Sequence, residues 1–135
     1  MSSPSSRMKS RRIVLILIVA LFVALLIRQA YLYATDSPYR ISSSEAKRRI
    51  QEGKIDLILD VRTLVERESL GSYPGSIHVP SSDLEAILPK AYPDKQTRIL
   101  AYCNTGHRAR MAVDKLHALG YNNAVYISST YSSLQ

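Results

Sequence analysis

The residues best suited to chemistry in this chain surround its single cysteine, Cys103. An apolar stretch precedes the cysteine, and a stretch with helical spacing follows it. A thiol between a strand and a helix lies where backbone N–H groups converge and the helix dipole is positive. Both features favour the thiolate, which is the nucleophilic form of cysteine. The pattern therefore predicts nucleophilic sulfur chemistry, whereas most lone cysteines are buried and inert.

The cysteine opens a six-residue segment that reads Cys103, Asn104, Thr105, Gly106, His107 and Arg108. We expect the backbone N–H groups of Asn104 through Arg108 to form an anion-binding ring around the sulfur. Gly106 allows the backbone to bend there without a Cβ penalty. Arg108 is expected to fix the loop and contact an anionic donor, and Asn104, Thr105, Gly106 and His107 are also predicted to contact substrate. His107 is open to a second interpretation as a general base.

Short apolar runs alternate with helical patterns over the rest of the chain. Strands are predicted at residues 55–61, 76–80, 99–102 and 123–127. Helices are predicted from Ser42 to Gly53, from 83 to a stop at Pro89, and from 109 to 119. Met111 is expected to face inward from the last of these helices. Residues 63–70 are predicted to form a short charged helix or a loop. This alternation favours an α/β fold with a central parallel sheet covered on both faces. Sites in such sheets lie at the carboxyl ends of the strands, where Asp60 and Cys103 are expected.

Other polar residues are given roles with less chemistry. Asp60 is predicted to act structurally or electrostatically, through local backbone, Arg62 or Arg108. Arg62 is a candidate for steering an anionic donor toward the site. His78 and His117 are predicted to be structural. Scattered histidines and one cysteine do not form a metal-binding pattern, so neither a metal nor another cofactor is predicted.

The N-terminal third has the composition of a membrane anchor. Residues 13–27 have no charged or polar side chain, and extension to residue 34 gives a length close to the roughly 20 residues that span a bilayer. A cleaved signal peptide is the alternative. We expect a basic, disordered segment at 1–12, a transmembrane anchor at 13–34, a linker at 35–39 and one domain at 40–135.

Charge is distributed unevenly along the chain. Residues 1–40 carry six basic residues against Asp36, which gives +5 of the total net charge of +7. The basic balance is therefore mainly a feature of the membrane flank, and no nucleic-acid partner is predicted. The positive-inside rule places the N-terminus in the cytosol and the domain on the opposite side of the membrane.

Four segments together resemble the rhodanese superfamily. They are Leu59–Arg62, Gly71–Pro80, Tyr102–Arg108 and Leu116–Tyr121. The resemblance covers roughly residues 39–127 and implies a three-layer rhodanese-like fold, with Cys103 as the nucleophile. Ser72 stands where the family usually has histidine. Ser129-Thr130-Tyr131 replaces the usual glycine pair and aromatic residue, so we expect a shortened closing element.

The resemblance implies a sulfurtransferase. Such an enzyme takes a sulfane sulfur from a small anionic donor such as thiosulfate, holds it as a persulfide on Cys103, and passes it to cyanide or a thiol. One alternative is a catalytically weak sulfur carrier or protein-binding module tethered to a membrane. A second is a phosphatase or arsenate-reductase-like enzyme. The loop argues against this, because four residues separate Cys103 from Arg108, one fewer than in cysteine-dependent phosphatases.

Overall fold

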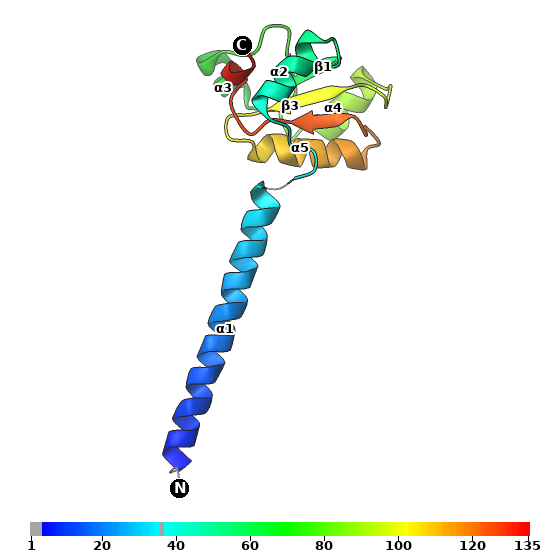
Figure 1. Ribbon diagram of the computed structural model, residues 1–135. Coiled ribbons are helices and arrows are strands. Elements are labelled where there is room, and N and C mark those ends of the chain that lie inside the picture. Colours follow the sequence, from blue (N-terminus) through cyan, green and yellow to red (C-terminus); the bar gives the residue numbers. More distant parts are fainter. Residues whose placement is uncertain (1–3, 36) are drawn as a thin grey trace. The chain divides into compact units, whose positions relative to one another are not determined.

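The computed structural model describes residues 4–35 and 37–135, with side chains described for 7–32 and 37–135. Contacts divide the chain into two units, Met1–Asp36 and Ser37–Gln135. Figure 1 shows the first as one helix and the second as a layered α/β unit.

The first unit contains helix α1, Pro4–Thr35. Its side chains from residue 7 to 32 are exposed, and the stretch Arg7–Leu32 is long and apolar enough to cross a membrane. A signal sequence would meet the same criterion. The helix differs from the expectation of a disordered segment at 1–12, because it includes residues 4–12, while 1–3 lie outside the described part. Helix propagation adds one backbone bond for each residue fixed, so a helix formed by the apolar run extends readily into its flank.

The second unit is built on a parallel sheet of four short strands. They are β1 Leu57–Asp60, β2 Ile77–His78, β3 Ile99–Tyr102 and β4 Ala124–Tyr126. Their spatial order is β2-β1-β3-β4. Asp60 pairs with His78 on one side and with Tyr102 on the other, so these three residues share the carboxyl edge of the sheet. The predicted α/β fold with a central parallel sheet is confirmed.

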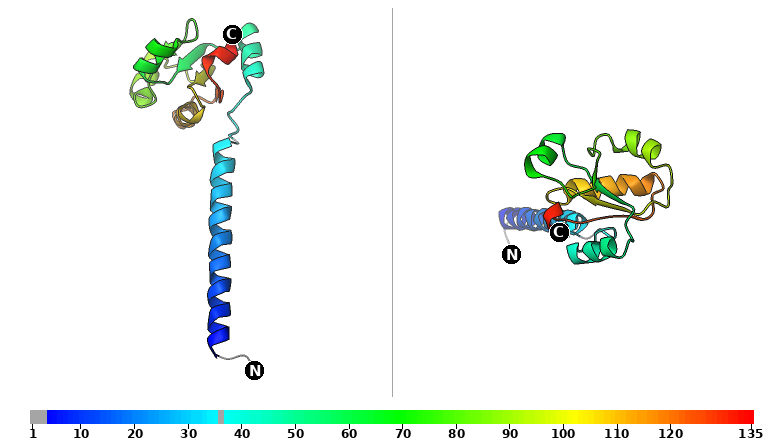
Figure 2. Two further views of the ribbon diagram at one scale, coloured as in Figure 1. Left: turned by 90° about the vertical axis from the view of Figure 1, so that its left-hand side faces the viewer. Right: turned by 90° about the horizontal axis from the view of Figure 1, so that it is seen from above.

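Alternate residues of the strands face two separate apolar clusters. Leu59 and Ala101 belong to the cluster that includes residues of α4, Leu84–Ala91, and α5, His107–Ala118. Leu100 and Tyr102 belong to the cluster that includes residues of α2, Ser43–Gln51, and the 3-10 helix η1, Tyr131–Leu134. Helices therefore cover both faces of the sheet, as predicted (Figure 2).

Two helices begin at side-chain caps that their sequences encode. The Ser42 hydroxyl accepts a hydrogen bond from the Glu45 N–H at the start of α2. Thr63 and Glu66 form a reciprocal capping box at the start of α3, Leu64–Leu70, which settles the helix-or-loop alternative for this segment. Thr63 thereby fixes the position of Glu66, which faces the site described below.

The structure differs from the prediction at the end of one helix and on the buried face of another. Helix α4 continues through Pro89 to Ala91. A proline inside a helix is unfavourable, but Leu84 and Leu88 are fully buried, and their packing holds the helix on the core. Met111 is 49% exposed and does not face inward. The buried stripe of α5 instead runs through Ala109, Ala112, Val113 and Leu116.

The C-terminal end closes the second cluster. Leu134 of η1 is 3% exposed, and the hydroxyl groups of Ser43, Ser129 and Ser133 hydrogen-bond one another at 2.8–2.9 Å. The short closing element expected from Ser129-Thr130-Tyr131 is therefore a 3-10 helix that docks on α2.

Candidate active site

Cys103 follows β3 directly and is 1% exposed. Its Sγ accepts a hydrogen bond of 3.0 Å from the Gly106 N–H. No second hydrogen bond to the sulfur is present among the described residues, so a wider ring of N–H donors stays a prediction. Gly106 is also the N-cap of the twelve-residue helix α5, so the sulfur lies at the positive end of the helix dipole. Both features stabilise a thiolate.

Gly106 is required by its conformation and its surroundings. Its φ of +95° is in the region that favours glycine, and a Cβ built there would lie 2.6 Å from the Ser128 Cα. Ser128 belongs to the segment that follows β4, so the two segments pack backbone against backbone. The close approach fixes the loop that presents the Gly106 N–H to the sulfur.

Arg108 is paired with a carboxylate that sequence analysis did not select. Its two terminal nitrogens donate to Glu66 Oε2 and Oε1 at 2.6 and 2.7 Å. The hydrogen bonds from Arg108 lower the pKa of Glu66 well below its usual range, and the hydrogen bond from the Thr63 N–H makes the next largest contribution. The contact with Glu66 raises the pKa of Arg108. The contact predicted between Arg108 and an anionic donor is thus made in this structure with a carboxylate of the protein.

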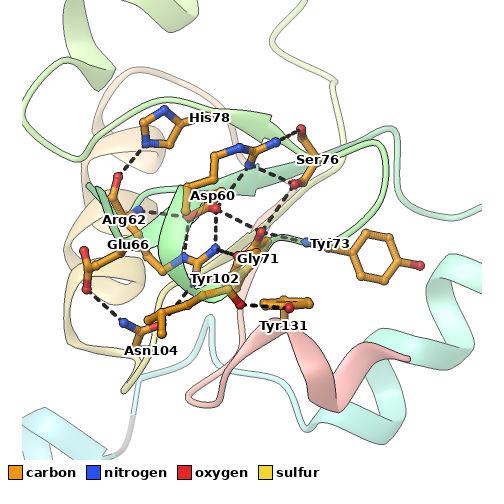
Figure 3. A network of polar contacts seen from close by, with 12 residues as sticks. Asp60, Arg62, Glu66, Gly71, Tyr73, Ser76, His78, Tyr102, Asn104 and Tyr131 are labelled. Atoms are coloured by element: carbon orange, nitrogen blue, oxygen red, sulfur yellow. Dashed lines mark hydrogen bonds and ion pairs between the residues drawn. The ribbon is translucent and has the colours of Figure 1, made fainter. Parts of the chain in front are cut away.

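Asn104 connects the loop to two other residues. Its Nδ2 donates to Glu66 Oε1 at 2.8 Å, and its Oδ1 accepts a 3.4 Å hydrogen bond from Arg62. Figure 3 shows Asn104 between these two side chains. Asn104 therefore orders the loop through the protein, and its predicted contact with substrate stays a prediction.

Asp60 is the centre of a buried polar network beneath the loop (Figure 3). It is fully buried and accepts from the Arg62 backbone and side chain at 2.8–3.0 Å. It also accepts from the Tyr102 hydroxyl at 3.0 Å and from Arg67 at 3.2 Å. Burial opposes ionisation of Asp60, but the hydrogen bonds from Arg62 outweigh it and lower the pKa. These contacts agree with a structural and electrostatic role.

Arg62 is held in this network. It is 1% exposed, donates to the Gly71 carbonyl at 2.6 Å, and lies over the rings of Tyr102 and Tyr131. Its donors therefore order neighbouring segments, and a part in steering an anionic donor stays a prediction. Burial raises the pKa of Tyr102, which keeps the hydroxyl protonated as the donor to Asp60.

The remaining candidates have simpler positions. Thr105 and His107 are exposed on the loop, where a substrate contact stays a prediction. His78 Nε2 bonds the Arg62 carbonyl, and His117 Nε2 bonds the Ala124 carbonyl while its ring stacks on Tyr39. Both histidines thus have the structural contacts expected of them. Across the described part of the chain, no group of three histidine, cysteine or carboxylate side chains gathers as a metal site.

Glu66 and Arg67 are charged residues at this site that sequence analysis did not select. A signal for Glu66 was present, because Thr63 precedes it at capping-box spacing. That spacing places a carboxylate on the first turn after β1 but does not reveal its partner, since Arg108 is 42 residues away. Arg67 follows Glu66 and reaches the Ser76 hydroxyl and carbonyl at 3.0 and 2.9 Å, as well as Asp60.

Comparison with known proteins agrees with this geometry. A family described as Rhodanese-like domain matches residues 42–131. A mouse protein, thiosulfate sulfurtransferase/rhodanese-like domain-containing protein 3, is 27% identical over 99 residues, which cover 65% of this chain and 62% of the mouse protein. The chain thus spans less than two thirds of the mouse protein's length.

Solved structures show the same fold. The human single-domain sulfurtransferase TSTD1 has a TM-score of 0.62 at 25% identity, covering 72% of this chain and 95% of the human chain. A protein of unknown function from Rhodopseudomonas palustris, described as a possible tyrosine phosphatase, has a TM-score of 0.65 at 22% identity and covers 76% and 83% of the two chains. The latter likeness concerns the fold alone. With its parallel sheet, its cysteine loop and the match over residues 42–131, the chain belongs to the rhodanese-like domain family.

Proposed function

We propose that this protein is a sulfurtransferase that carries a sulfane sulfur as a persulfide on Cys103. The donor is a small sulfur compound such as thiosulfate, and the acceptor is a thiol or cyanide. The observation that carries the proposal is the Gly106 N–H bond to the sulfur at the start of α5. A single N–H donor and a helix N-terminus stabilise the charge that a thiolate or a persulfide bears.

Membership of the rhodanese-like family and the sulfurtransferases among its relatives support a sulfurtransferase function in general. The donor, the acceptor and the persulfide belong to the proposal. The short loop between Cys103 and Arg108 supports sulfur transfer over phosphate hydrolysis, as argued from the sequence.

The proposed reaction has two displacement steps. The Cys103 thiolate attacks the outer sulfur of thiosulfate, the S–S bond breaks, and sulfite leaves with its electron pair. An acceptor thiolate or cyanide then attacks the outer sulfur of the Cys103 persulfide, which regenerates the thiolate. The Gly106 N–H and the α5 dipole stabilise the sulfur anion before and after each step.

The direct test is intact mass spectrometry of the full chain in detergent after incubation with thiosulfate. We expect a mass gain of about one sulfur atom that is absent in Cys103→Ser and is removed by cyanide. A folded protein whose thiol is alkylated by iodoacetamide but gains no sulfur from thiosulfate or an organic persulfide would contradict the proposal. That outcome would favour the protein-binding module alternative.

We also propose that α1 anchors the protein in a membrane with its basic N-terminus in the cytosol. Arg7, Lys9, Arg11 and Arg12 precede the apolar stretch, and the side chains of that stretch are exposed. The positive-inside rule supports this orientation.

A further inference from the structure

The capping of α3 explains only some of the hydrogen bonds that Glu66 accepts. Thr63 donates to Oε2 through its N–H and its hydroxyl, both at 2.9 Å. Arg108 donates to both carboxylate oxygens, and Asn104 donates to Oε1. Two of these partners belong to the loop that carries Cys103. The carboxylate therefore links the start of α3 to the candidate nucleophile's own loop.

Apolar packing does not explain the position of Glu66. Helix α3 has no buried residue, and its apolar side chains Leu64, Val65 and Leu70 are 54%, 70% and 57% exposed. Among the described residues, the side chains of α3 that hydrogen-bond neighbouring elements are those of Glu66 and Arg67. The Tyr131 hydroxyl adds one contact, to the Leu70 carbonyl at 3.0 Å. Glu66 is therefore placed by its charged and polar partners.

The pairing cancels the positive charge that an anionic donor would meet. Arg108 faces Glu66, while Arg62 and Arg67 both face Asp60. With Cys103 as a thiolate, these six groups have no net charge. The Arg108 side chain is only one third exposed, and both of its terminal nitrogens already contact Glu66. An anion must compete with this carboxylate for the guanidinium.

Sulfur donors differ in how much they need that positive charge. Thiosulfate brings two negative charges to a thiolate, and sulfite leaves with two. An organic hydropersulfide, R–S–SH, brings one charge or none: the thiolate attacks its outer sulfur, the S–S bond breaks, and R–S⁻ leaves with the electron pair. In the neutral case the proton stays on the transferred sulfur. The repulsion on approach is therefore greater for thiosulfate.

We infer that Glu66 is a specificity-determining residue that selects sulfur donors by charge: it neutralises Arg108, disfavours doubly charged donors such as thiosulfate, and favours organic hydropersulfides. The inference rests on the proposed role of Cys103 as a sulfur acceptor. Glu66 acts through Arg108 and the loop, so it is a positioning residue for this selection.

The test compares two alkylating reagents that differ by one charge, iodoacetate and iodoacetamide. The ratio of their rates at Cys103 reports the electrostatic potential there, and loop distortion that slows both reagents cancels in the ratio. In the full chain in detergent we expect Glu66→Gln to raise the iodoacetate to iodoacetamide ratio about threefold to tenfold at low ionic strength. Added salt should reduce this gain.

Two further variants control the experiment. Glu68→Gln makes the same charge change at an exposed position of the same helix, and we expect it to move the ratio less than about twofold. Arg108→Gln leaves the Glu66 charge in place and should lower the ratio. An unchanged ratio in Glu66→Gln, or a change equal to that of Glu68→Gln, would overturn the inference.

Sulfur uptake then separates this inference from the proposed function. We expect Glu66→Gln to increase the rate of persulfide formation from thiosulfate relative to that from an alkyl hydropersulfide. The increase should be about the same factor as the alkylation ratio for a singly charged hydropersulfide, and about the square of that factor for a neutral one. Equal factors for both donors would contradict charge selection while leaving sulfur transfer intact. Failure of both donors in the wild-type protein would reject sulfur transfer at Cys103, and the alkylation ratio would still decide the charge effect of Glu66.

Discussion

At the scale of single residues, the cysteine loop depends on one backbone conformation. Gly106 donates the N–H hydrogen bond to the sulfur, is the N-cap of α5, and packs against the Ser128 backbone. A side chain at this position would disturb all three contacts. The chemistry of Cys103 is therefore more sensitive to Gly106 than to the exposed loop residues Thr105 and His107.

We expect Gly106→Ala to slow persulfide formation by about 10- to 100-fold, because small displacements of reacting groups are costly. The free energy of unfolding of this variant should fall by more than the roughly 1–2 kcal/mol that a left-handed non-glycine residue costs, since the Cβ meets the Ser128 backbone. Mass spectrometry after timed exposure to a sulfur donor and urea unfolding measure the two effects.

Gly53→Ala is the matched control for this prediction. Gly53 also has a positive φ, +68°, but a Cβ there meets nothing within 4 Å. This variant should lose only about 1–2 kcal/mol of stability and retain the wild-type rate of sulfur uptake. Equal losses in the two variants would show that contact with Ser128 has no special importance.

Sequence and structure agree best where a residue's role follows from local spacing. The loop from Cys103 to Arg108, its glycine and the start of α5 follow from neighbouring residues. The Glu66–Arg108 pair could not be predicted in this way, because it depends on how the start of α3 docks beside the loop. The burial of Arg62 could not be predicted from local spacing either, because charged side chains are rarely buried and this one depends on Asp60 and on two tyrosine rings.

At the scale of elements, β1 has a carboxylate at each end, and the two differ in burial. Asp60 ends the strand, is fully buried and faces Arg62, which is 1% exposed. Asp56 directly precedes the strand and pairs with Arg98 at 2.6 Å, with both side chains more than 40% exposed. The strand thus offers a comparison of a buried and an exposed ion pair in one element.

We expect Asp60→Asn to reduce the free energy of unfolding by about 3–5 kcal/mol, because it leaves the Arg62 charge buried without its counter-ion. Asp56→Asn should cost about 0–1 kcal/mol, since water screens the exposed pair. Chemical unfolding of both variants measures the difference. Similar small losses would mean that the Asp60 network contributes little to stability.

The exposed pair also predicts a pH dependence. Hydrogen bonds from the Arg98 side chain and backbone lower the pKa of Asp56 from 3.8 to about 2. A carboxylate with a lowered pKa stabilises the fold above its unfolded value, and this contribution is lost as the pH falls through the folded value. The stability difference between wild type and Asp56→Asn should therefore be constant above about pH 5 and disappear as the pH approaches 2. A difference that grows on acidification would contradict this assignment.

The positions of strands and helices along the chain were predictable at this scale because they follow from hydrophobic runs of known length. The spatial order of the strands, β2-β1-β3-β4, does not follow from run lengths and was not predicted. Helix α4 passes through Pro89 although a proline inside a helix is unfavourable, because Leu84 and Leu88 hold the helix on the core; a rule based on proline alone misses this packing. The closing element η1 could not be read from a motif, because its stability comes from contacts of Leu134 and of serine hydroxyl groups with α2.

At the scale of the whole molecule, the two units differ in whether their apolar side chains are buried or exposed. The unit Ser37–Gln135 packs the apolar side chains of its strands into two buried clusters. Helix α1 exposes its apolar side chains all around, including Leu17 and Phe22, at 63% and 61%. Exposed apolar surface is unfavourable in water at roughly 25 cal/mol per Å². A lipid environment removes this cost and is the basis for the proposed anchor.

The anchor can be tested against the signal-peptide alternative with the full chain expressed in cells. We expect the protein to remain in the membrane pellet after alkaline carbonate treatment and to retain the N-terminal residues by mass. Leu21→Arg, close to the middle of the apolar stretch, should release a large part of it, because an arginine at the bilayer centre costs about 2.5–3.5 kcal/mol. Met8→Arg adds the same charge on the basic flank and should leave membrane retention unchanged. A soluble product that lacks residues 1–34 would instead identify this segment as a cleaved signal.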